Sequence, residues 1–512
     1  MTDTSQNNKR IAKNAIFLYF RMFFSMAVSL FTSRVVLQTL GVMDYGIWNV
    51  VGGVIAMFSF LNASMAGCTN RFLSFELGRR DYVKLQQVFS SALTIHILIA
   101  LIILVLGETV GLWFLREKLV IPSDRMFAAN IIYQITIISS MITITQVPYN
   151  AMIMANERMN VYAYIEIANV CLKLAIVYML YISPFDKLIS YGILTFTVTL
   201  LIMISYRVYC IKKLKSCKFK LSLDRSIIKP MLSFSGWDLY GNASVMARTQ
   251  GVNMLLNMFF TSVMNAASAI ATSVQGAVMA FAGNVLAAFR PQIVKTYATG
   301  EYETMVDLIR KASVYTTYLL LIFTFPLLLE TDYILKIWLK TPPDYAATLC
   351  RYVLLFNVIA NLSSVLISGV HATGHIIRSS FINGTCYLLV IPFSYFAFKM
   401  GMKAEIAYAF NIIAVCIGMT QNLFVLSKYV TILKKRKYFF NIILKYLIVG
   451  LITYFISELV RDMLSVSFKR LCITTLTTTT LFSVMTFFFI FNVHERNFAI
   501  NKFVSLKHKI HL

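Results

Sequence analysis

The chain has 512 residues, of which 58% are hydrophobic and 13% charged, and its mean hydropathy is +0.71. A soluble domain carries about twice that share of charged residues, so the composition excludes a soluble globular protein. The net charge of +25 is concentrated in alternate loops between apolar stretches. That placement is typical of membrane topology and argues against binding to nucleic acid.

Long apolar stretches follow one another along almost the whole chain. An α-helix needs about 20 predominantly apolar residues to cross a bilayer, and about fourteen stretches satisfy this. The first is too long for the apolar core of a signal peptide and is expected to be a retained span. The sequence therefore predicts an all-α integral membrane protein with spans near 12–38, 46–68, 88–114, 127–154, 161–182, 188–209, 231–258, 264–289, 312–330, 350–370, 379–398, 405–426, 440–457 and 472–491.

The basic residues predict the orientation of these spans. Four groups lie on one side of the predicted membrane, the same side as both termini: Arg79, Arg80 and Lys84; the run 212–220; the cluster 434–437; and the tail at Lys507 and Lys509. Cytoplasmic loops carry the excess of Lys and Arg. We therefore expect a multi-pass membrane protein with both termini in the cytoplasm.

A weak internal repeat divides the chain. At an offset of 220 residues, Asp81-Tyr82 matches Glu301-Tyr302, and each pair follows a glycine, Gly78 or Gly300. This offset equals six predicted spans, so two parallel six-helix bundles are expected, as in transporters that bind substrate between two halves. The predicted organisation is a first bundle at 1–210, a cytoplasmic linker at 211–230, a second bundle at 231–430, and two additional spans with a basic tail at 431–512.

Ionisable groups within the spans mark candidate functional positions, because such groups are costly in lipid and usually face a bundle interior or a wet cavity. Arginines and one lysine outnumber the acids in this set, which favours an anionic substrate, and a guanidinium suits phosphate well. The acids could tune the arginines or carry a coupling ion. The set comprises Arg21, Arg34, Arg71, Glu166, Lys173, Asp238, Arg248 and Arg290.

Polar stripes accompany these charges on four predicted spans. At 100° per residue, each of the following sets lies on one face: Ser139, Thr143, Gln146 and Asn150; Glu166, Asn169 and Lys173; Asp238, Asn242, Thr249 and Asn253; and Asn265, Ser268, Thr272 and Gln275. Stripes from both halves predict one central hydrophilic cavity. The alternative for each Ser, Thr or Asn is an interhelical hydrogen bond, and Arg34, Arg71 and Arg290 could instead extend to lipid headgroups.

No motif for ATP hydrolysis, zinc proteolysis or a nucleophilic serine is present in the sequence. His371 and His375 have metal-ligand spacing, but a surface pair at a helix end explains them without a third ligand. The cysteines form no CxxC pair. We therefore expect no enzyme activity, cofactor or metal. A membrane glycosyltransferase or ligase is the third alternative, with Asp332 and Asp344 as its only candidate acids.

Several segments resemble the polysaccharide-transporter branch of the multidrug, oligosaccharidyl-lipid and polysaccharide (MOP) exporter superfamily, over roughly residues 10–430. The resemblance is fairly specific for flippases of O-antigen or capsular repeat units. It rests on 33–41 with Asp44-Tyr45-Gly46, on 70–78, on 146–151 with Glu157-Arg158-Met159, on 248–253, on Asn265-Ala266-Ala267 and on 290–295. Relatives often have an arginine after the Asn-Ala-Ala motif, where this chain has Ser268.

The resemblance implies a MATE-like fold, alternating access and export of undecaprenyl-pyrophosphate-linked oligosaccharides for surface polysaccharide, with membrane lipids, a polymerase and a chain-length regulator as partners. A cation-coupled exporter of small molecules on the same fold is the alternative function. The candidate substrate-binding residues are Arg21, Arg34, Arg71, Gln146, Asn150, Lys173, Asn242, Arg248, Asn253, Gln275 and Arg290, and the candidate ion-coupling residues are Glu166 and Asp238. By analogy, the last two spans are expected to form a groove for the polyprenyl tail.

Overall fold

A computed structural model describes residues 59–497 except 118–120, 215, 221–223, 261 and 494, together with 14, 16–25, 28, 32, 35–36, 39–41, 44, 47–48 and 51. Every regular element of these residues is a helix, which confirms the all-α class. Eleven of these helices are long and apolar enough to cross a membrane. The predicted total of about fourteen stays a prediction, and 12 of the 27 residues of the first predicted span, 12–38, lie outside the described residues.

The chain forms two compact units, Met1–Asn242 with Ala287–Glu301, and Ala243–Leu286 with Tyr302–Leu512. The helices α8 (Arg225–Phe259) and α9 (Ser262–Ala298) contribute residues to both units. The bundle boundaries drawn from the sequence stay predictions.

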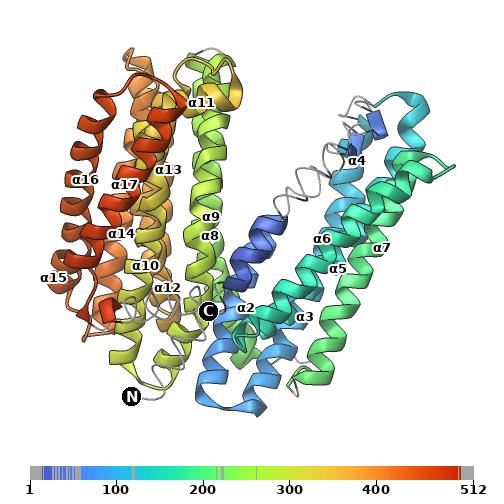
Figure 1. Cartoon of the computed structure of the whole chain (residues 1–512). Helices are drawn as coiled ribbons and strands as arrows, with labels where there is room; N and C mark the ends of the chain where they lie inside the picture. The colour runs from blue at the N-terminus through green and yellow to red at the C-terminus, as the bar shows by residue number, and fades with distance from the viewer. Residues whose placement is uncertain are drawn as a thin grey trace, which may run out of the picture. The chain divides into compact units, whose positions relative to one another are not determined.

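The first unit is built around the helix α5, which packs against α2, α3, α6 and α7 (Figure 1). Its core includes Ile132, Tyr133 and Ile137 of α5 with Leu180 of α6 and Leu188 of α7. The elements are α2 (Ser59–Arg79), α3 (Tyr82–Leu106), the π-helix η1 (Gly107–Gly111), α4 (Leu112–Glu117), the 3-10 turn η2 (Ser123–Arg125), α5 (Met126–Ala155), α6 (Met159–Ile182) and α7 (Lys187–Lys213).

Two glycines explain why η1 interrupts the helical run from α3 to α4. The buried Tyr133 hydroxyl donates a 2.6 Å hydrogen bond to the carbonyl of Gly107. A Cβ on Gly111 would lie 2.1 Å from the same hydroxyl, so only glycine leaves room for it. A π-bulge widens the helix locally and changes its carbonyl pairing, which lets the side chain of α5 bond to the backbone of η1.

An ion-pair cluster joins three segments of the first unit. Arg125 Nη2 lies 2.5 Å from Asp44 Oδ2, and Arg125 Nη1 lies 2.6 Å from Asp186 Oδ2. Asp186 also caps α7 by accepting hydrogen bonds from the N–H groups of Leu188 and Ile189, both at 3.0 Å. Asp44 belongs to the Asp-Tyr-Gly motif, so the structure gives this motif residue a structural partner 81 residues away.

The pH dependence of stability is expected to include a contribution from Asp186. Partial burial alone would raise the pKa of Asp186, but the hydrogen bond and charge of Arg125 and the two capping N–H groups hold it below its ordinary value. The stabilisation is therefore present above the unfolded pKa of about 3.9 and is lost as the pH falls through the folded pKa. Asp186→Asn should lower the stability by up to about 1 kcal/mol at pH 7. Thermal unfolding of the purified protein at pH 7 and at pH 3 tests this, and an equal deficit at both would contradict it.

A buried glutamate links the turn after α5 to the end of α9 within the first unit. The side chain of Glu157 is 1% exposed, and its Oε1 lies 2.6 Å from Lys295 Nζ. Its Oε2 accepts a 2.5 Å hydrogen bond from Gln292 Nε2. The helices α2 and α9 also approach closely, since a Cβ on Gly78 would lie 2.9 Å from the backbone of Lys295. This end of α9 is therefore held to α2 and to the α5–α6 turn.

In the second unit, α14 packs against α12 and α13, and α10 packs against α12. A Cβ on Gly369 of α12 would lie 2.7 Å from Leu426 of α14, so these two helices pack closely at a glycine. The further elements are α10 (Tyr302–Leu329), α11 (Thr331–Leu339), α12 (Ala346–Thr373), α13 (Ile377–Lys399), α14 (Glu405–Tyr429), α15 (Lys435–Tyr438), the π-helix η3 (Phe439–Leu444), α16 (Lys445–Asp462) and α17 (Phe468–Phe489).

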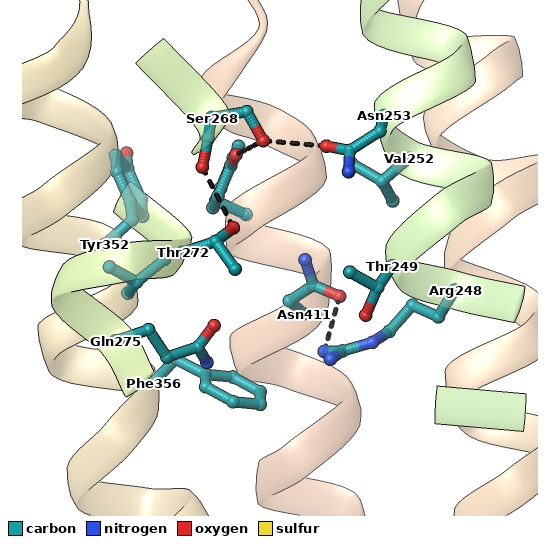
Figure 2. Close-up of a pocket in the computed structure, with 12 residues that line it drawn as sticks. Arg248, Thr249, Val252, Asn253, Ser268, Thr272, Gln275, Tyr352, Phe356 and Asn411 are labelled. Atoms are coloured by element: carbon teal, nitrogen blue, oxygen red, sulfur yellow. Dashed lines mark hydrogen bonds between the residues drawn. The ribbon is translucent and has the colours of Figure 1, made fainter. Parts of the chain in front are cut away.

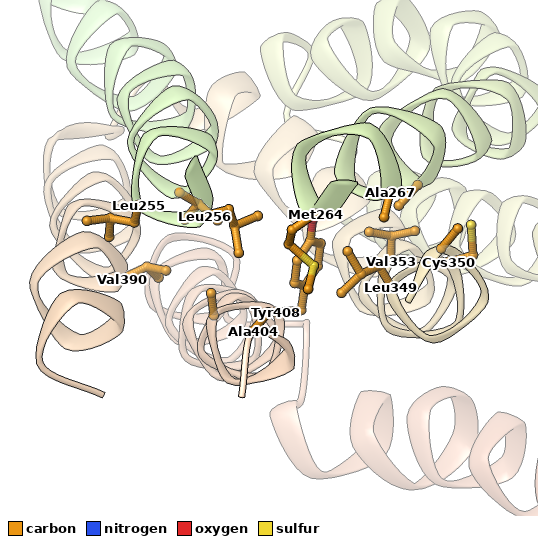
Figure 3. Packing of buried hydrophobic residues seen from close by; sticks show 14 of the residues in the cluster. Leu255, Leu256, Met264, Ala267, Leu349, Cys350, Val353, Val390, Ala404 and Tyr408 are labelled. Carbon is orange, nitrogen blue, oxygen red and sulfur yellow. The ribbon is translucent and has the colours of Figure 1, made fainter. Parts of the chain in front are cut away.

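The main apolar cluster of the second unit brings together residues of six helices, α8, α9, α11, α12, α13 and α14, near the C-terminal end of α8 and the N-terminal end of α9. Leu256 of α8, Ala267 of α9 and Leu349 of α12 are fully buried there. In the same cluster, Val390 of α13 lies beside Leu255 and Leu256, and Tyr408 of α14 lies beside Met264 (Figure 3). Buried apolar surface is the main stabilising term in such packing, so this cluster fixes how α8, α9, α12 and α14 meet.

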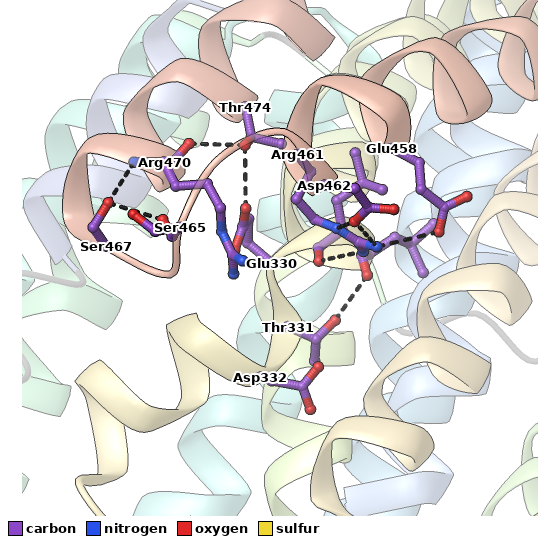
Figure 4. Close-up of polar contacts among 12 residues, drawn as sticks. Glu330, Thr331, Asp332, Glu458, Arg461, Asp462, Ser465, Ser467, Arg470 and Thr474 are labelled. Atoms are coloured by element: carbon purple, nitrogen blue, oxygen red, sulfur yellow. Dashed lines mark hydrogen bonds and ion pairs between the residues drawn. The ribbon is translucent and has the colours of Figure 1, made fainter.

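Polar contacts attach the last two long helices to α10. At one end, Arg470 Nη2 lies 2.7 Å from Glu330 Oε2, and Thr474 Oγ1 lies 3.1 Å from Glu330 Oε1 (Figure 4). The Glu330 side chain is 0% exposed. At the other end, Arg310 of α10 pairs with Glu495 at 2.8 Å. α17 and Glu495, which follows it, are thus bonded to Arg310 of α10 and to Glu330, the residue directly after α10.

Candidate functional site

The second unit contains a polar cavity between four helices (Figure 2). Its volume is about 40 Å³, which is room for a few water molecules and too small for a sugar. The apolar cluster described above closes one side of it, because Val252, Val353 and Tyr408 belong to both. The lining residues are Arg248, Thr249, Val252 and Asn253 of α8, Ser268, Thr272 and Gln275 of α9, Tyr352, Val353 and Phe356 of α12, and Tyr408 and Asn411 of α14.

Arg248 is the only charged residue among those that line the cavity. It is 8% exposed, and its Nη1 donates a 3.0 Å hydrogen bond to Asn411 Oδ1. Its guanidinium carbon lies 5.1 Å from the ring centroid of Phe356 and 4.8 Å from that of Tyr387. Its Nε has no hydrogen-bond partner, and Arg248 pairs with no carboxylate, among the residues that the structure describes.

This environment is unusual for a buried cation. Buried charges are ordinarily paired with an opposite charge or fully hydrogen-bonded. Aromatic faces stabilise a guanidinium in part, and the Asn411 amide satisfies one of its five N–H donors. The remaining capacity of Arg248 to donate hydrogen bonds suits an anion.

A hydrogen-bond chain lies beside Arg248 in the same cavity. Tyr408 donates to Ser268 Oγ at 2.8 Å, and Ser268 Oγ donates to Asn253 Oδ1 at 2.7 Å. Thr272 Oγ1 donates to the backbone carbonyl of Ser268 at 2.9 Å. Because Asn253 Oδ1 accepts the hydrogen bond from Ser268, the orientation of the Asn253 amide is fixed, and its NH₂ group is available to donate a hydrogen bond into the cavity. Ser268 stands where the resembling family often has an arginine. In this structure its hydroxyl bonds to Tyr408 of α14 and Asn253 of α8, and so links α8, α9 and α14.

A second polar cluster lies in the first unit. Asn242 Nδ2 is 3.1 Å from Asp238 Oδ2 and 3.2 Å from Ser64 Oγ of α2. Arg290 of α9 is near enough to Asp238 to interact with its charge. A Cβ on Gly67 would lie 3.7 Å from the same carboxylate. The structure thus brings together three of the predicted site residues, Asp238, Asn242 and Arg290.

Glu166 is part of a third group, also in the first unit. Tyr206 donates a 2.9 Å hydrogen bond to Glu166 Oε1, and Asn169 Nδ2 lies 3.4 Å from Oε2. Arg21 stacks over Tyr162, with its guanidinium carbon 5.1 Å from the ring centroid. Lys173, predicted to share the face of Glu166, is exposed and forms no ion pair with it among the described residues.

The remaining predicted residues are dispersed. Gln146 Nε2 lies 3.5 Å from Asn150 Oδ1, a contact one helical turn apart. Arg71 lies over the rings of Phe72, Phe75 and Phe234, at 4.6, 5.4 and 5.5 Å from their centroids. Arg34 lies outside the described residues. Of the eleven predicted substrate-binding residues, the structure places Arg248, Asn253 and Gln275 in one cavity.

The residues of this site that were not predicted include Tyr387, Tyr408 and Asn411. Tyrosines in apolar spans resemble ordinary packing residues, and their contacts with Arg248 and Ser268 are tertiary. Asn411 could have been found from the sequence, because an amide inside an otherwise apolar span usually has a hydrogen-bond partner on another helix. Neither His371 nor His375 belongs to a cluster of at least three His, Cys, Asp or Glu residues that could hold a metal within the described part of the chain. His375 stacks on Tyr429 with 3.9 Å between the ring centroids.

No protein-family model matches this sequence, and no curated protein matches it. Solved structures do match over most of the chain. An outward-facing multidrug resistance MATE family transporter of the MOP superfamily aligns with a TM-score of 0.69 at 11% identity, covering 83% of this chain and 97% of that one.

Two further solved structures give the same result. A Vibrio cholerae MATE transporter variant aligns with a TM-score of 0.64 at 15% identity and coverages of 84% and 98%. A MOP superfamily transporter from Pyrococcus furiosus, described as having a binding pocket of reverse polarity that suggests a different function, aligns at 0.68 with 12% identity and coverages of 82% and 96%. The chain therefore has the MATE fold.

Proposed function

We propose that this protein is a flippase that moves undecaprenyl-pyrophosphate-linked oligosaccharide repeat units from the cytoplasmic to the periplasmic leaflet of a bacterial inner membrane, for O-antigen or capsule synthesis. The observation that carries the proposal is Arg248, a buried guanidinium with no acidic partner among the described residues. The MATE fold supports transport by alternating access between two halves.

In this proposal the cavity binds the phosphate end of the substrate. Its volume of about 40 Å³ excludes the oligosaccharide, so the sugars lie outside it and only phosphate oxygens replace the water it has room for. Arg248 and the Asn253 amide donate hydrogen bonds to those oxygens. Charge-assisted bonds of this kind are about twice as strong as neutral ones.

The acids of the first unit are assigned to coupling. Glu166 accepts a hydrogen bond from Tyr206, and Asp238 accepts one from Asn242 and also interacts with the charge of Arg290. A carboxylate in such a setting can exchange a proton or bind a cation, and the membrane potential is a further energy source. We assign a polysaccharide polymerase and a chain-length regulator as downstream partners.

The alternative is a cation-coupled exporter of small molecules. Cationic drugs favour acidic and aromatic linings, and the second-unit cavity has Phe356, Tyr352 and Tyr408 but no carboxylate among its described lining residues. The Pyrococcus furiosus transporter, with its binding pocket of reverse polarity, supports the view that one fold serves ligands of different charge. The positive charge of Arg248 favours the anionic substrate.

The proposal predicts that Arg248→Gln reduces transport by about 10- to 100-fold, because hydrogen bonds to charged groups are worth about 1.5–3 kcal/mol. Arg248→Lys should retain part of the activity, since it keeps the charge and loses the planar donor set. The assay measures lipid-linked intermediates in both leaflets of cells that depend on each variant. Undecaprenyl-pyrophosphate oligosaccharide should accumulate in the cytoplasmic leaflet, with surface polysaccharide lost.

Arg351→Gln is the matched control, because Arg351 is a partly exposed arginine of the same unit that pairs with Asp332 instead of lining the cavity. Normal transport by Arg248→Gln at normal expression would refute the phosphate assignment. Accumulation in the periplasmic leaflet would place the defect at a later polymerase or ligase step. Unchanged pools with altered drug sensitivity would favour the exporter.

A further inference from the structure

A second cavity of the second unit lies between α13 and α14, away from the residues that line the Arg248 cavity. It is an open groove of about 530 Å³. Its walls are mainly apolar, with Ile382 of α13 and Ile417 and Phe424 of α14. Ile417 is 47% exposed and Phe424 is 50% exposed. In a membrane-spanning helix pair, such a surface contacts lipid.

Cations gather at one end of this groove. Arg378, in the first turn of α13, lines the groove together with Phe424, near the last turn of α14. Lys435 Nζ lies 4.1 Å from the ring centroid of Phe424. Arg378 is exposed and has no hydrogen-bond or ion-pair partner among the residues described here. One positive charge therefore lines the groove at this end, and a second lies over the ring of Phe424, which lines it too.

The interior of the groove has one polar group that lacks a partner. Gln421 lines it, and the Nε2 atom of Gln421 is buried with no hydrogen-bond partner within the described structure. A buried amide without a partner is costly, so an occupant that carries a carbonyl or ester oxygen at this depth would stabilise it. The groove thus offers charge at its end, a hydrogen-bond donor below it and apolar walls beyond.

The length of the groove sets the size of its occupant. From Cys416 to Phe424 the α14 helix rises about 12 Å, close to the roughly 15 Å hydrocarbon depth of one leaflet. The sequence also puts the basic cluster 434–437 at this end, where basic residues attract anionic headgroups. A polyprenyl chain is much longer than one leaflet is deep, whereas a phospholipid matches it.

We propose that this groove is a binding site for one anionic phospholipid. Its phosphate lies between Arg378 and Lys435, its ester oxygens accept a hydrogen bond from Gln421, and an acyl chain lies along Ile417 and Ile382. The site is separate from the proposed transport cavity and is independent of which substrate that cavity takes.

The test is native mass spectrometry of the purified full-length protein, delipidated and then mixed with equal amounts of dioleoyl phosphatidylglycerol and dioleoyl phosphatidylcholine. The wild-type protein should bind phosphatidylglycerol in preference. The double variant Arg378→Gln/Lys435→Gln should weaken that binding about 25-fold, because each basic residue near an anionic lipid contributes about a fivefold effect. Thr420→Trp, which fills the groove and keeps both charges, should reduce binding of both lipids.

The double variant Lys399→Gln/Lys403→Gln is the matched control, because it removes the same charge from the opposite ends of α13 and α14. It should leave the preference unchanged. Equal binding of both lipids by the wild-type protein, or equal losses in the two double variants, would overturn the proposal. Displacement of phosphatidylglycerol by an equal amount of undecaprenyl phosphate would also overturn it, since the groove would then belong to a polyprenyl chain. The transport assay of Arg248→Gln decides the proposed function separately.

Discussion

Glu330→Ala is expected to destabilise the protein by about 3–5 kcal/mol, the range measured when one member of a buried ion pair is removed. The Glu330 side chain is 0% exposed, and Arg470, its partner, is 15% exposed. The substitution leaves the Arg470 guanidinium in a buried site without its carboxylate, and Arg470 Nε already has no partner in the described structure. The midpoint of thermal unfolding, followed by helical circular dichroism in detergent, measures the loss.

The pair Asp332–Arg351 is the control, because its side chains are 71% and 39% exposed. Asp332→Asn should cost less than about 1 kcal/mol, as exposed pairs do. The double variant Glu330→Leu/Arg470→Met should recover most of the stability lost in Glu330→Ala, because apolar residues of similar volume can replace a buried pair. A double variant no more stable than the single one would show that the loss does not come from the unpaired charge.

Glu157→Ala is the second large expected effect, at about 2–4 kcal/mol. The substitution removes the acceptor of the buried Gln292 amide, and a buried donor left without a partner costs about 1–3 kcal/mol. It also removes the carboxylate from Lys295, which is 21% exposed, so the loss of this pair is partly offset by solvent. Thermal unfolding in detergent is again the measurement.

The backbone at Glu157 provides a sharper comparison. Its φ of +58° is in the left-handed region, which costs a residue with a Cβ about 1–2 kcal/mol and glycine nothing. Glu157→Gly deletes the same contacts as Glu157→Ala, and should therefore be about 1 kcal/mol more stable than it. Glu301→Gln, at an exposed acid of the same unit, should change the stability by less than about 0.5 kcal/mol. Equal stability of the glycine and alanine variants would contradict this account.

The helices were largely predictable because apolar length is a local property. The predicted span at 188–209 lies within α7, and the span at 379–398 lies within α13. The span at 88–114 was predicted as one helix, whereas the structure has α3, η1 and α4 over it. That interruption depends on the Tyr133 hydroxyl, which comes from another helix, so no local pattern contains it.

The candidate site was predictable only in part, for the same reason. Helical spacing placed Asp238, Asn242, Thr249 and Asn253 on one face of a single span, but α8 contributes Asp238 and Asn242 to one unit and Thr249 and Asn253 to the other. The stripe therefore serves two polar clusters. The partner of Arg248, Asn411, is 163 residues away, and Glu330 was seen only as the start of a loop. Pairings at such separations depend on how helices pack.

The contact between Glu330 and Arg470 has a consequence for the order of synthesis. The two residues are 140 positions apart, and a ribosome completes the N-terminal part of a chain first. The end of α10 therefore enters the membrane with an acid whose partner has not yet been made. In a nascent chain that stops before Arg470, Glu330 has no counter-charge. The ion pair at this end of α10 therefore forms only after α17, the last long helix, has been made.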